Sequence, residues 1–136
     1  MQIDPHLLNV LLAVILGGMI GLDRQKKHQA AGLRTHMLVC VASTVLITSA
    51  ISYFGEGRTE IAPIAQAIMT GIGFLGAGAI ISKNAHVHGL TTAASIWCVA
   101  ALGIIIGFGE YLMATIVAVF ITLLLTHKSI DRILAG

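Results

Sequence analysis

Residues 71–94 read GIGFLGAGAIISKNAHVHGLTTAA and decide the fold, because they fit two incompatible structures. Gly71, Gly73 and Gly76 match the G-x-G-x-x-G pattern of a dinucleotide-binding turn, where glycines let a pyrophosphate approach a helix N-terminus. The same glycines lie in a segment, residues 61–82, that is apolar and carries no charge. Such a segment is long enough to cross a bilayer as a helix. The first pattern predicts an enzyme and the second a membrane protein.

Composition favours the membrane protein. Hydrophobic residues make up 57% of the 136-residue chain and charged residues only 10%, whereas soluble domains carry roughly 25% charged residues. A dinucleotide site would also need an acidic residue about 20 positions after the glycines, and residues 85–109 contain no Asp or Glu. We therefore expect a non-enzymatic protein without a cofactor, surrounded by the lipid bilayer and with no nucleic-acid partner.

Five apolar segments separate at short polar breaks, which predicts an all-α bundle of about five transmembrane helices. Asp4 is a plausible N-cap for the first helix, and Pro5 fits the first helical position. The two cysteines, Cys40 and Cys98, lie within predicted helices and are expected to be buried free thiols. The whole chain, residues 1–136, is predicted to be a single transmembrane domain. The predicted spans are residues 5–22, 33–54, 61–82, 90–107 and 111–126.

The distribution of cations predicts the orientation of the bundle. With five spans, seven of the eight Lys and Arg residues fall on one side of the membrane, and only Arg58 falls on the other. Cytoplasmic loops carry the excess of Lys and Arg. We therefore expect the N-terminus outside and the C-terminus in the cytoplasm, as for a multi-pass protein of a bacterial inner membrane. The seven cations are Arg24, Lys26, Lys27, Arg34, Lys83, Lys128 and Arg132.

Small residues form several helix faces. Gly17 with Gly21, and Gly103 with Gly107, are G-x-x-x-G pairs that allow helices in lipid to approach closely. In the third segment, Gly71 and Gly78 share a face, whereas Gly73 continues a stripe begun by two polar residues. The small residues of this helix either pack against another helix or line a cavity. The stripe consists of Gln66, Thr70 and Gly73.

Two polar clusters are functional candidates. A turn through residues 83–88 leads to the start of the fourth helix, which contains Gly89, Thr91 and Thr92. Either the free amides at this helix start bind an anion, or Thr91 simply caps the helix. The second cluster lies between the first two helices; there Asp23 is either part of a structural salt bridge or an ion or proton site. Five histidines near the same side show no zinc spacing, so no metal site is expected. The second cluster comprises Asp23, Arg24, Arg34 and Thr35.

Three blocks of the sequence resemble the signatures of the MgtC/SapB family of bacterial inner-membrane proteins. They are GLDRQKKHQAAGLRT (residues 21–35), AQAIMTGIGFLGAG (residues 65–78) and HGLTTAASIW (residues 88–97). The resemblance implies about five spans, links to magnesium homeostasis, acid stress and virulence, and contact with the membrane part of ATP synthase. It also implies a short form without the ACT-like domain that many members carry after the last span. The family motif positions are Asp23, Arg24, Gly32, Arg34, Thr35, Gln66, Thr70, Gly71, Gly73, Gly76, Gly78, Gly89, Thr91 and Thr92.

Two functional hypotheses follow. In the first, the protein is a regulator that places its small-residue helix faces against another membrane protein or a second copy of itself. In the second, Gln66, Thr70 and the glycine stripe belong to a pathway for an ion such as Mg²⁺ or for a small solute. A dedicated magnesium cage is disfavoured, because Mg²⁺ prefers carboxylate oxygens and no acid lies within a predicted span. Five short helices are too few to enclose a wide pore alone, so a homodimer is expected.

Overall fold

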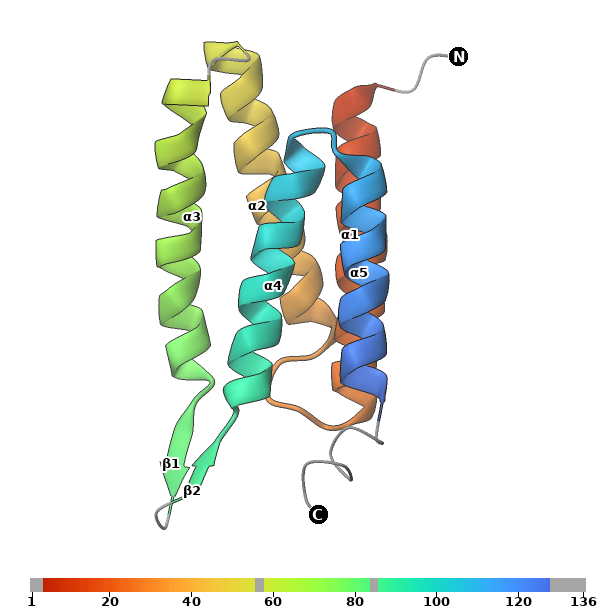
Figure 1. Cartoon of the computed structure of the whole chain (residues 1–136), viewed down its shortest axis with the longest axis vertical. Coiled ribbons are helices and arrows are strands. Elements are labelled where there is room, and N and C mark those ends of the chain that lie inside the picture. The colour runs from red at the N-terminus through yellow and green to blue at the C-terminus, as the bar shows by residue number, and fades with distance from the viewer. Residues whose placement is uncertain (1–3, 56–57, 84–85, 128–136) are drawn as a thin grey trace.

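The computed structural model describes residues 4–55, 58–83 and 86–127 and forms a bundle of upright helices with a short hairpin at one end (Figure 1). The helices run alternately up and down, as the short connections require. In chain order the elements are α1 (Pro5–Lys26), α2 (Leu33–Phe54), α3 (Arg58–Gly78), β1 (Ile81–Lys83), β2 (His86–His88), α4 (Leu90–Gly107) and α5 (Tyr111–Thr126).

The helices confirm the predicted all-α architecture. α2, α4 and α5 have the bounds expected from the sequence, and α1 continues four residues beyond the expected end, to Lys26. Asp4 caps α1 as expected, because its carboxylate accepts a hydrogen bond from the His6 amide at 2.9 Å. Pro5 occupies the first turn, where its missing N–H costs nothing.

The prediction for the third segment is wrong at its C-terminal end. α3 begins at Arg58 and ends at Gly78, and residues 81–83 form β1 instead of continuing the helix. The Ala79 amide bonds to the Gly76 carbonyl at 3.0 Å, a tightened turn that ends the helix. β1 then pairs antiparallel with β2, with Ile81 opposite His88, so both ends of the expected turn through residues 83–88 lie in paired strands, while its centre, residues 84–85, lies outside the described residues. A short apolar run does not distinguish strand from helix by hydropathy alone.

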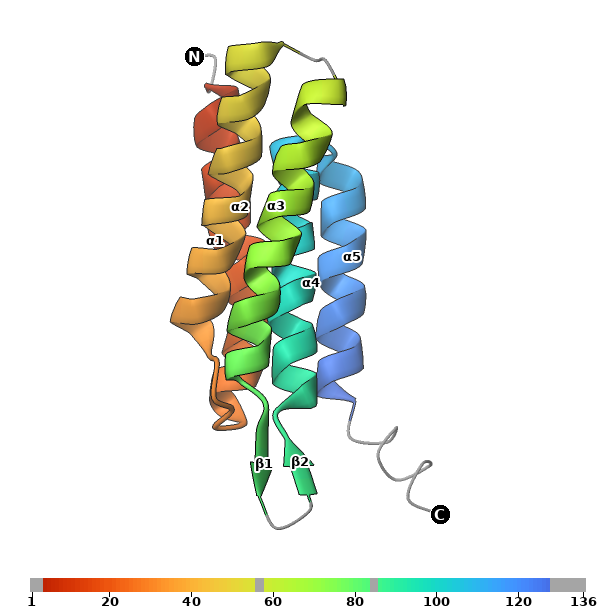
Figure 2. The ribbon, with the colours of Figure 1, turned by 90° about the vertical axis from the view of Figure 1, so that its left-hand side faces the viewer.

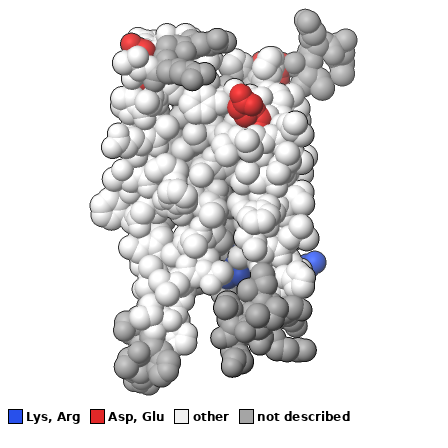
Figure 3. Space-filling view, viewed as in Figure 1, with Lys and Arg blue, Asp and Glu red and all other residues white. Residues whose placement is uncertain are grey.

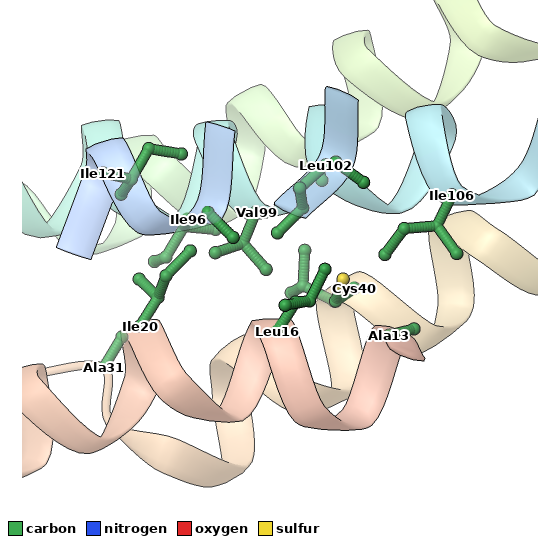
Figure 4. Close-up of a cluster of buried hydrophobic side chains, with 14 residues drawn as sticks. Ala13, Leu16, Ile20, Ala31, Cys40, Ile96, Val99, Leu102, Ile106 and Ile121 are labelled. Carbon is green, nitrogen blue, oxygen red and sulfur yellow. The ribbon is translucent and has the colours of Figure 1, made fainter. Parts of the chain in front are cut away.

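α4 lies at the centre of the bundle, because it contacts the other four helices, and α5 packs beside α1 and α4. α3 lies at the edge, against α4 and to a lesser extent α2 (Figures 1 and 2). Fully buried apolar side chains from α1, α2 and α4 fill the centre (Figure 4). Both cysteines are free, with Cys40 buried and Cys98 half-buried. The central side chains include Ala13, Ile20, Cys40, Val99, Leu102 and Ile106.

The two predicted G-x-x-x-G pairs are the contact points of α2 with its neighbours. A β-carbon added at Gly17 would lie 2.8 Å from Cys40 Cβ, and one at Gly21 would lie 2.8 Å from the α-carbon of Leu33. A β-carbon at Gly107 would lie 2.7 Å from Ile47 Cβ. These distances are shorter than real Cβ contacts, so α1 and α4 approach α2 this closely only through glycine.

Four helices, α1 to α4, are long and apolar enough to cross a membrane, whereas α5 is apolar but only 16 residues long. At 1.5 Å per residue α5 extends about 24 Å, less than a typical hydrocarbon core of about 30 Å. On the face shown in Figure 3, acidic side chains lie at the upper end and Lys and Arg at the lower end, with an uncharged surface between them. Length, composition and surface are those of a membrane protein.

Candidate functional site

Five polar residues meet at the hairpin end of the bundle, and we call them the polar cluster: Arg24, Gln29, His36, Thr92 and Ser95. Four of them are buried, and only Gln29, in the connection between α1 and α2, is exposed. Gly21 positions the cluster, because it lets the start of α2 approach α1. Thr92 and Ser95 are three residues apart in the first turns of α4 and therefore share a face.

Arg24 is the charged member, with only 4% of its surface exposed. Its Nη2 donates to Gln29 Oε1 at 3.0 Å and more weakly to Thr92 Oγ1 at 3.4 Å. Its Nε is buried without a hydrogen-bond partner among the described residues. The ion pair at this end joins other residues, Lys27 and Asp23, whose charged atoms are 3.1 Å apart.

His36 joins α2 to α4. Its Nδ1 lies 2.8 Å from the Gly32 carbonyl oxygen, which can only accept, so Nδ1 carries a proton. Its Nε2 lies 3.0 Å from Ser95 Oγ, and that hydroxyl is also 2.8 Å from the Thr92 carbonyl. With one proton, the Ser95 hydroxyl can donate to only one of these two acceptors at a time.

The structure separates the neighbours Asp23 and Arg24. The Asp23 carboxylate accepts from Thr126 Oγ1 at 3.2 Å and pairs with Lys27, whose ammonium also donates to the Leu125 carbonyl. The ion pair is local to the end of α1, since its two residues are four positions apart, and the hydrogen bonds from Thr126 and Lys27 join it to the end of α5. Of the other predicted members, Arg34 is exposed and Thr35 is half-buried, and neither makes a side-chain hydrogen bond within the described residues.

The start of α4 differs from one expectation. The cap position is Gly89, with φ at +88°, and no side chain in the described part of the chain caps the helix. Thr91 lies exposed in the first turn and does not cap it. Thr92 instead points into the bundle, where its hydroxyl donates to Gln29 Oε1 at 3.3 Å. The first amides of α4 are therefore left without a capping side chain.

The candidates of the third segment lie mostly on the outside of the bundle. A β-carbon at Gly76 would contact Ala93 of α4, with its carbonyl oxygen at 3.6 Å, whereas β-carbons at the other three glycines would meet nothing within 4 Å. Thr70 bonds only to the backbone carbonyl of Gln66, at 2.9 Å. Only 11% of the α3 span is buried, compared with 50% of α4. We call this exposed set the open face of α3: Gln66, Thr70, Gly71, Gly73, Phe74 and Gly78.

Sequence reasoning missed Gln29 and His36 as members of the polar cluster. A helical signal for His36 existed, since it shares a face with Cys40 and Ser43, four and seven positions later, and that face is buried. For Gln29 no signal existed, because its place depends on the path of the connection. Within the described part of the chain, no three His, Cys, Asp or Glu residues are placed to hold a metal ion.

Comparisons with known proteins match this chain to one family. The model of the MgtC family matches residues 10–131. Protein MgtC of Salmonella typhimurium (strain LT2) is 42% identical over 132 residues, which cover 95% of this chain and 56% of that protein. Protein MgtC of Brucella abortus (strain 2308) is 45% identical over 109 residues, covering 80% of this chain and 45% of that protein. The chain thus spans about half the length of the curated relatives it matches. No solved structure matches it.

Proposed function

We propose, because this chain belongs to the MgtC family, that it is a non-enzymatic, multi-pass protein of the bacterial inner membrane that regulates a membrane partner through direct contact between helices. The proposed orientation places the N-terminus outside and the polar cluster at the cytoplasmic end. The processes implied by the family resemblance, magnesium homeostasis, acid stress and virulence, are the proposed setting. The chain spans about half of these relatives, so the activities of the whole relatives are proposed for it and not assigned to it.

The open face of α3 is the observation that supports this function. Helices in lipid associate through close packing of small residues and through interhelical hydrogen bonds. α1 and α4 use their glycines for this purpose within the chain, whereas a β-carbon added at Gly71, Gly73 or Gly78 would meet no atom of the described residues within 4 Å. Gln66 adds an exposed amide within the apolar span. A polar group in lipid is costly unless it finds a hydrogen-bond partner.

The proposed partner is a transmembrane helix that presents small residues and a polar group to this face. The membrane part of ATP synthase is the partner implied by the family resemblance, and a second copy of this chain offers the same surface. A homodimer would place two α3 helices together. We expect the contact to change the activity of the partner, while this chain itself catalyses no reaction.

Leucine at Gly71 or Gly73 tests the contact. We expect Gly71→Leu and Gly73→Leu to reduce capture of ATP synthase membrane subunits, or of a differently tagged second copy, at least tenfold, because the bulky side chain prevents close approach. Ala42→Leu is the matched control, since Ala42 is an exposed small residue on α2. All variants should elute as folded protein, because these positions have no neighbours to displace. Equal capture by the Gly73→Leu and control proteins would contradict the proposal.

An ion or small-solute pathway is the alternative. An open groove of about 820 Å³ lies between α1, α2 and α5 and extends along α1 from Val14 to Lys26, with Thr122 and Thr126 on its α5 side. Gln66 and Thr70, the residues that suggested a pathway, lie instead on the outer surface of α3. Ion flux into liposomes at high protein density distinguishes the two functions: the regulator should give no flux above that of empty liposomes, and a saturable flux would favour the pathway.

A further inference from the structure

Arg24 carries a buried charge without a carboxylate partner among the described residues. Arg24 is buried, with 4% of the residue exposed, yet the nearby Asp23 carboxylate is directed to Lys27 and Thr126. Breaking or omitting one half of a buried ion pair costs several kcal/mol, and buried charges are normally paired. The site therefore has an excess of positive charge.

The helix that meets Arg24 increases this excess. Thr92, which contacts Arg24 Nη2, lies in the first turn of α4. A helix N-terminus carries a partial positive charge and free amides, and no side chain of the described residues caps this one. A guanidinium and a helix N-terminus repel each other, whereas each favours an anion.

Hydrogen-bond donors also outnumber acceptors here. Arg24 Nη2 and Thr92 Oγ1 both donate to the same oxygen, Gln29 Oε1, and Arg24 Nε donates to nothing among the described residues. Gln29 is neutral and exposed, and apart from these two donors its side chain bonds only through its own amide, which donates to the Lys27 carbonyl at 3.1 Å. Its side chain can swing outward without disturbing the packed bundle.

We propose that Arg24, Thr92 and the first turn of α4 bind a phosphate-type oxyanion, which takes the place of the Gln29 side-chain oxygen. The guanidinium offers paired N–H donors that match the geometry of phosphate. The Thr92 hydroxyl and the α4 amides supply the remaining donors. The site lies where α1 leaves its apolar segment, so both a free phosphate and the phosphate of a lipid headgroup can reach it.

Thermal unfolding of the full chain in a neutral detergent tests the site. A ligand that binds only the folded state stabilises it in a saturable way. We therefore expect inorganic phosphate to raise the unfolding midpoint by several degrees and to reach a plateau, and chloride at equal ionic strength to leave it unchanged. The same measurement with dihexanoylphosphatidic acid tests a lipid headgroup as the ligand, and dihexanoylphosphatidylcholine is its zwitterionic control. A response to phosphate identifies a free anion, and a response to phosphatidic acid alone identifies a lipid headgroup; no response to either overturns the proposal.

Two substitutions at Gln29 keep the test independent of folding defects. Gln29→Glu supplies a carboxylate from the chain itself, so this variant should be more stable than the parent without phosphate and should no longer respond to it. Gln29→Ala removes the competing oxygen, so phosphate should reach half-saturation at a lower concentration. A parent-like response of Gln29→Glu overturns the proposal.

Substitution of the cations separates a specific site from general charge attraction. Arg24→Gln should lose the response to phosphate, and persistence of the response in this variant overturns the proposal. Lys26→Gln and Arg34→Gln each remove one exposed positive charge from the same end of the bundle. Both should respond to phosphate as the parent does, and an equal loss in these controls would show that only overall charge attracts the anion, which also overturns the proposal.

Discussion

Gly103→Ala should destabilise the bundle by about 3 kcal/mol or more, the upper end of what overpacking a core costs. The added β-carbon would collide with the Cys40 carbonyl oxygen and lie 2.8 Å from Ser43 Cβ. The colliding oxygen belongs to the backbone of α2, so no rotamer change relieves the contact. The shift would also stretch the buried hydrogen bond from Thr44 Oγ1 to the Gly103 carbonyl, now 2.9 Å long. Such a loss is a large part of the stability of about 5–15 kcal/mol typical of a folded domain.

Gly71→Ala and Gly73→Ala are the matched controls, because β-carbons at these positions meet nothing within 4 Å. We expect neither to be less stable than the parent and each to gain at most about 1 kcal/mol, because alanine is favoured over glycine inside a helix. Denaturant unfolding in mild detergent, followed through the fluorescence of Trp97, the single tryptophan, measures all three variants. An unfolding midpoint of Gly103→Ala equal to that of the parent would contradict the packing described for α2 and α4.

Hydropathy predicted most of the helical architecture because the polar breaks coincide with the ends of the helices. The bounds of α2, α4 and α5 follow from the sequence for this reason. α1 runs four residues past its apolar part, since Arg24 is buried among polar partners instead of ending the helix. The end of α3 was not predictable, because residues 79–82 are as apolar as the helix before them and their strand pairing depends on residues 86–88.

Glycine patterns predicted which helix faces allow another helix to approach closely. They did not predict which of these faces are in contact within one chain. The pairs in α1 and α4 contact α2, whereas three of the four glycines in the α3 block face outward. Sequence spacing places residues on a common helix face and carries no information on what covers that face. The direction of α3 depends on long-range packing against α4, through Gly76 and Ala93.

The polar cluster was predicted in part. Asp23 and Arg24 are adjacent in sequence, and their opposite charges suggested a single site. On a helix, however, neighbouring residues point about 100° apart, so Asp23 reaches α5 and Arg24 reaches α4. The pairing of Arg24 with Thr92 joins residues 68 positions apart, and no local pattern predicts such a contact.

Outside the close contacts of α1 and α4 with α2, Gly89→Ala should lower the unfolding free energy more than any other addition of one β-carbon. Gly89 has φ at +88°, a left-handed conformation that costs an L-residue about 1–2 kcal/mol. A β-carbon there would also collide with the carbonyl oxygen of Ala79 and lie 3.0 Å from its carbonyl carbon. Relief requires moving the hairpin away from the start of α4, which displaces Thr92 from Arg24. We expect a loss of more than about 3 kcal/mol in unfolding free energy, measured as for Gly103→Ala.

Gly109 allows the two causes to be separated, because it has φ at +81° and nothing within 4 Å of an added β-carbon. Gly109→Ala should therefore cost only the backbone strain of about 1–2 kcal/mol. Asparagine tolerates left-handed backbone better than alanine does, so Gly109→Asn should recover most of the parent stability. Gly89→Asn should remain as unstable as Gly89→Ala, since its β-carbon meets the same carbonyl oxygen. Rescue by asparagine at Gly89 would mean that backbone strain, and not the close approach of the hairpin, fixes glycine at the start of α4.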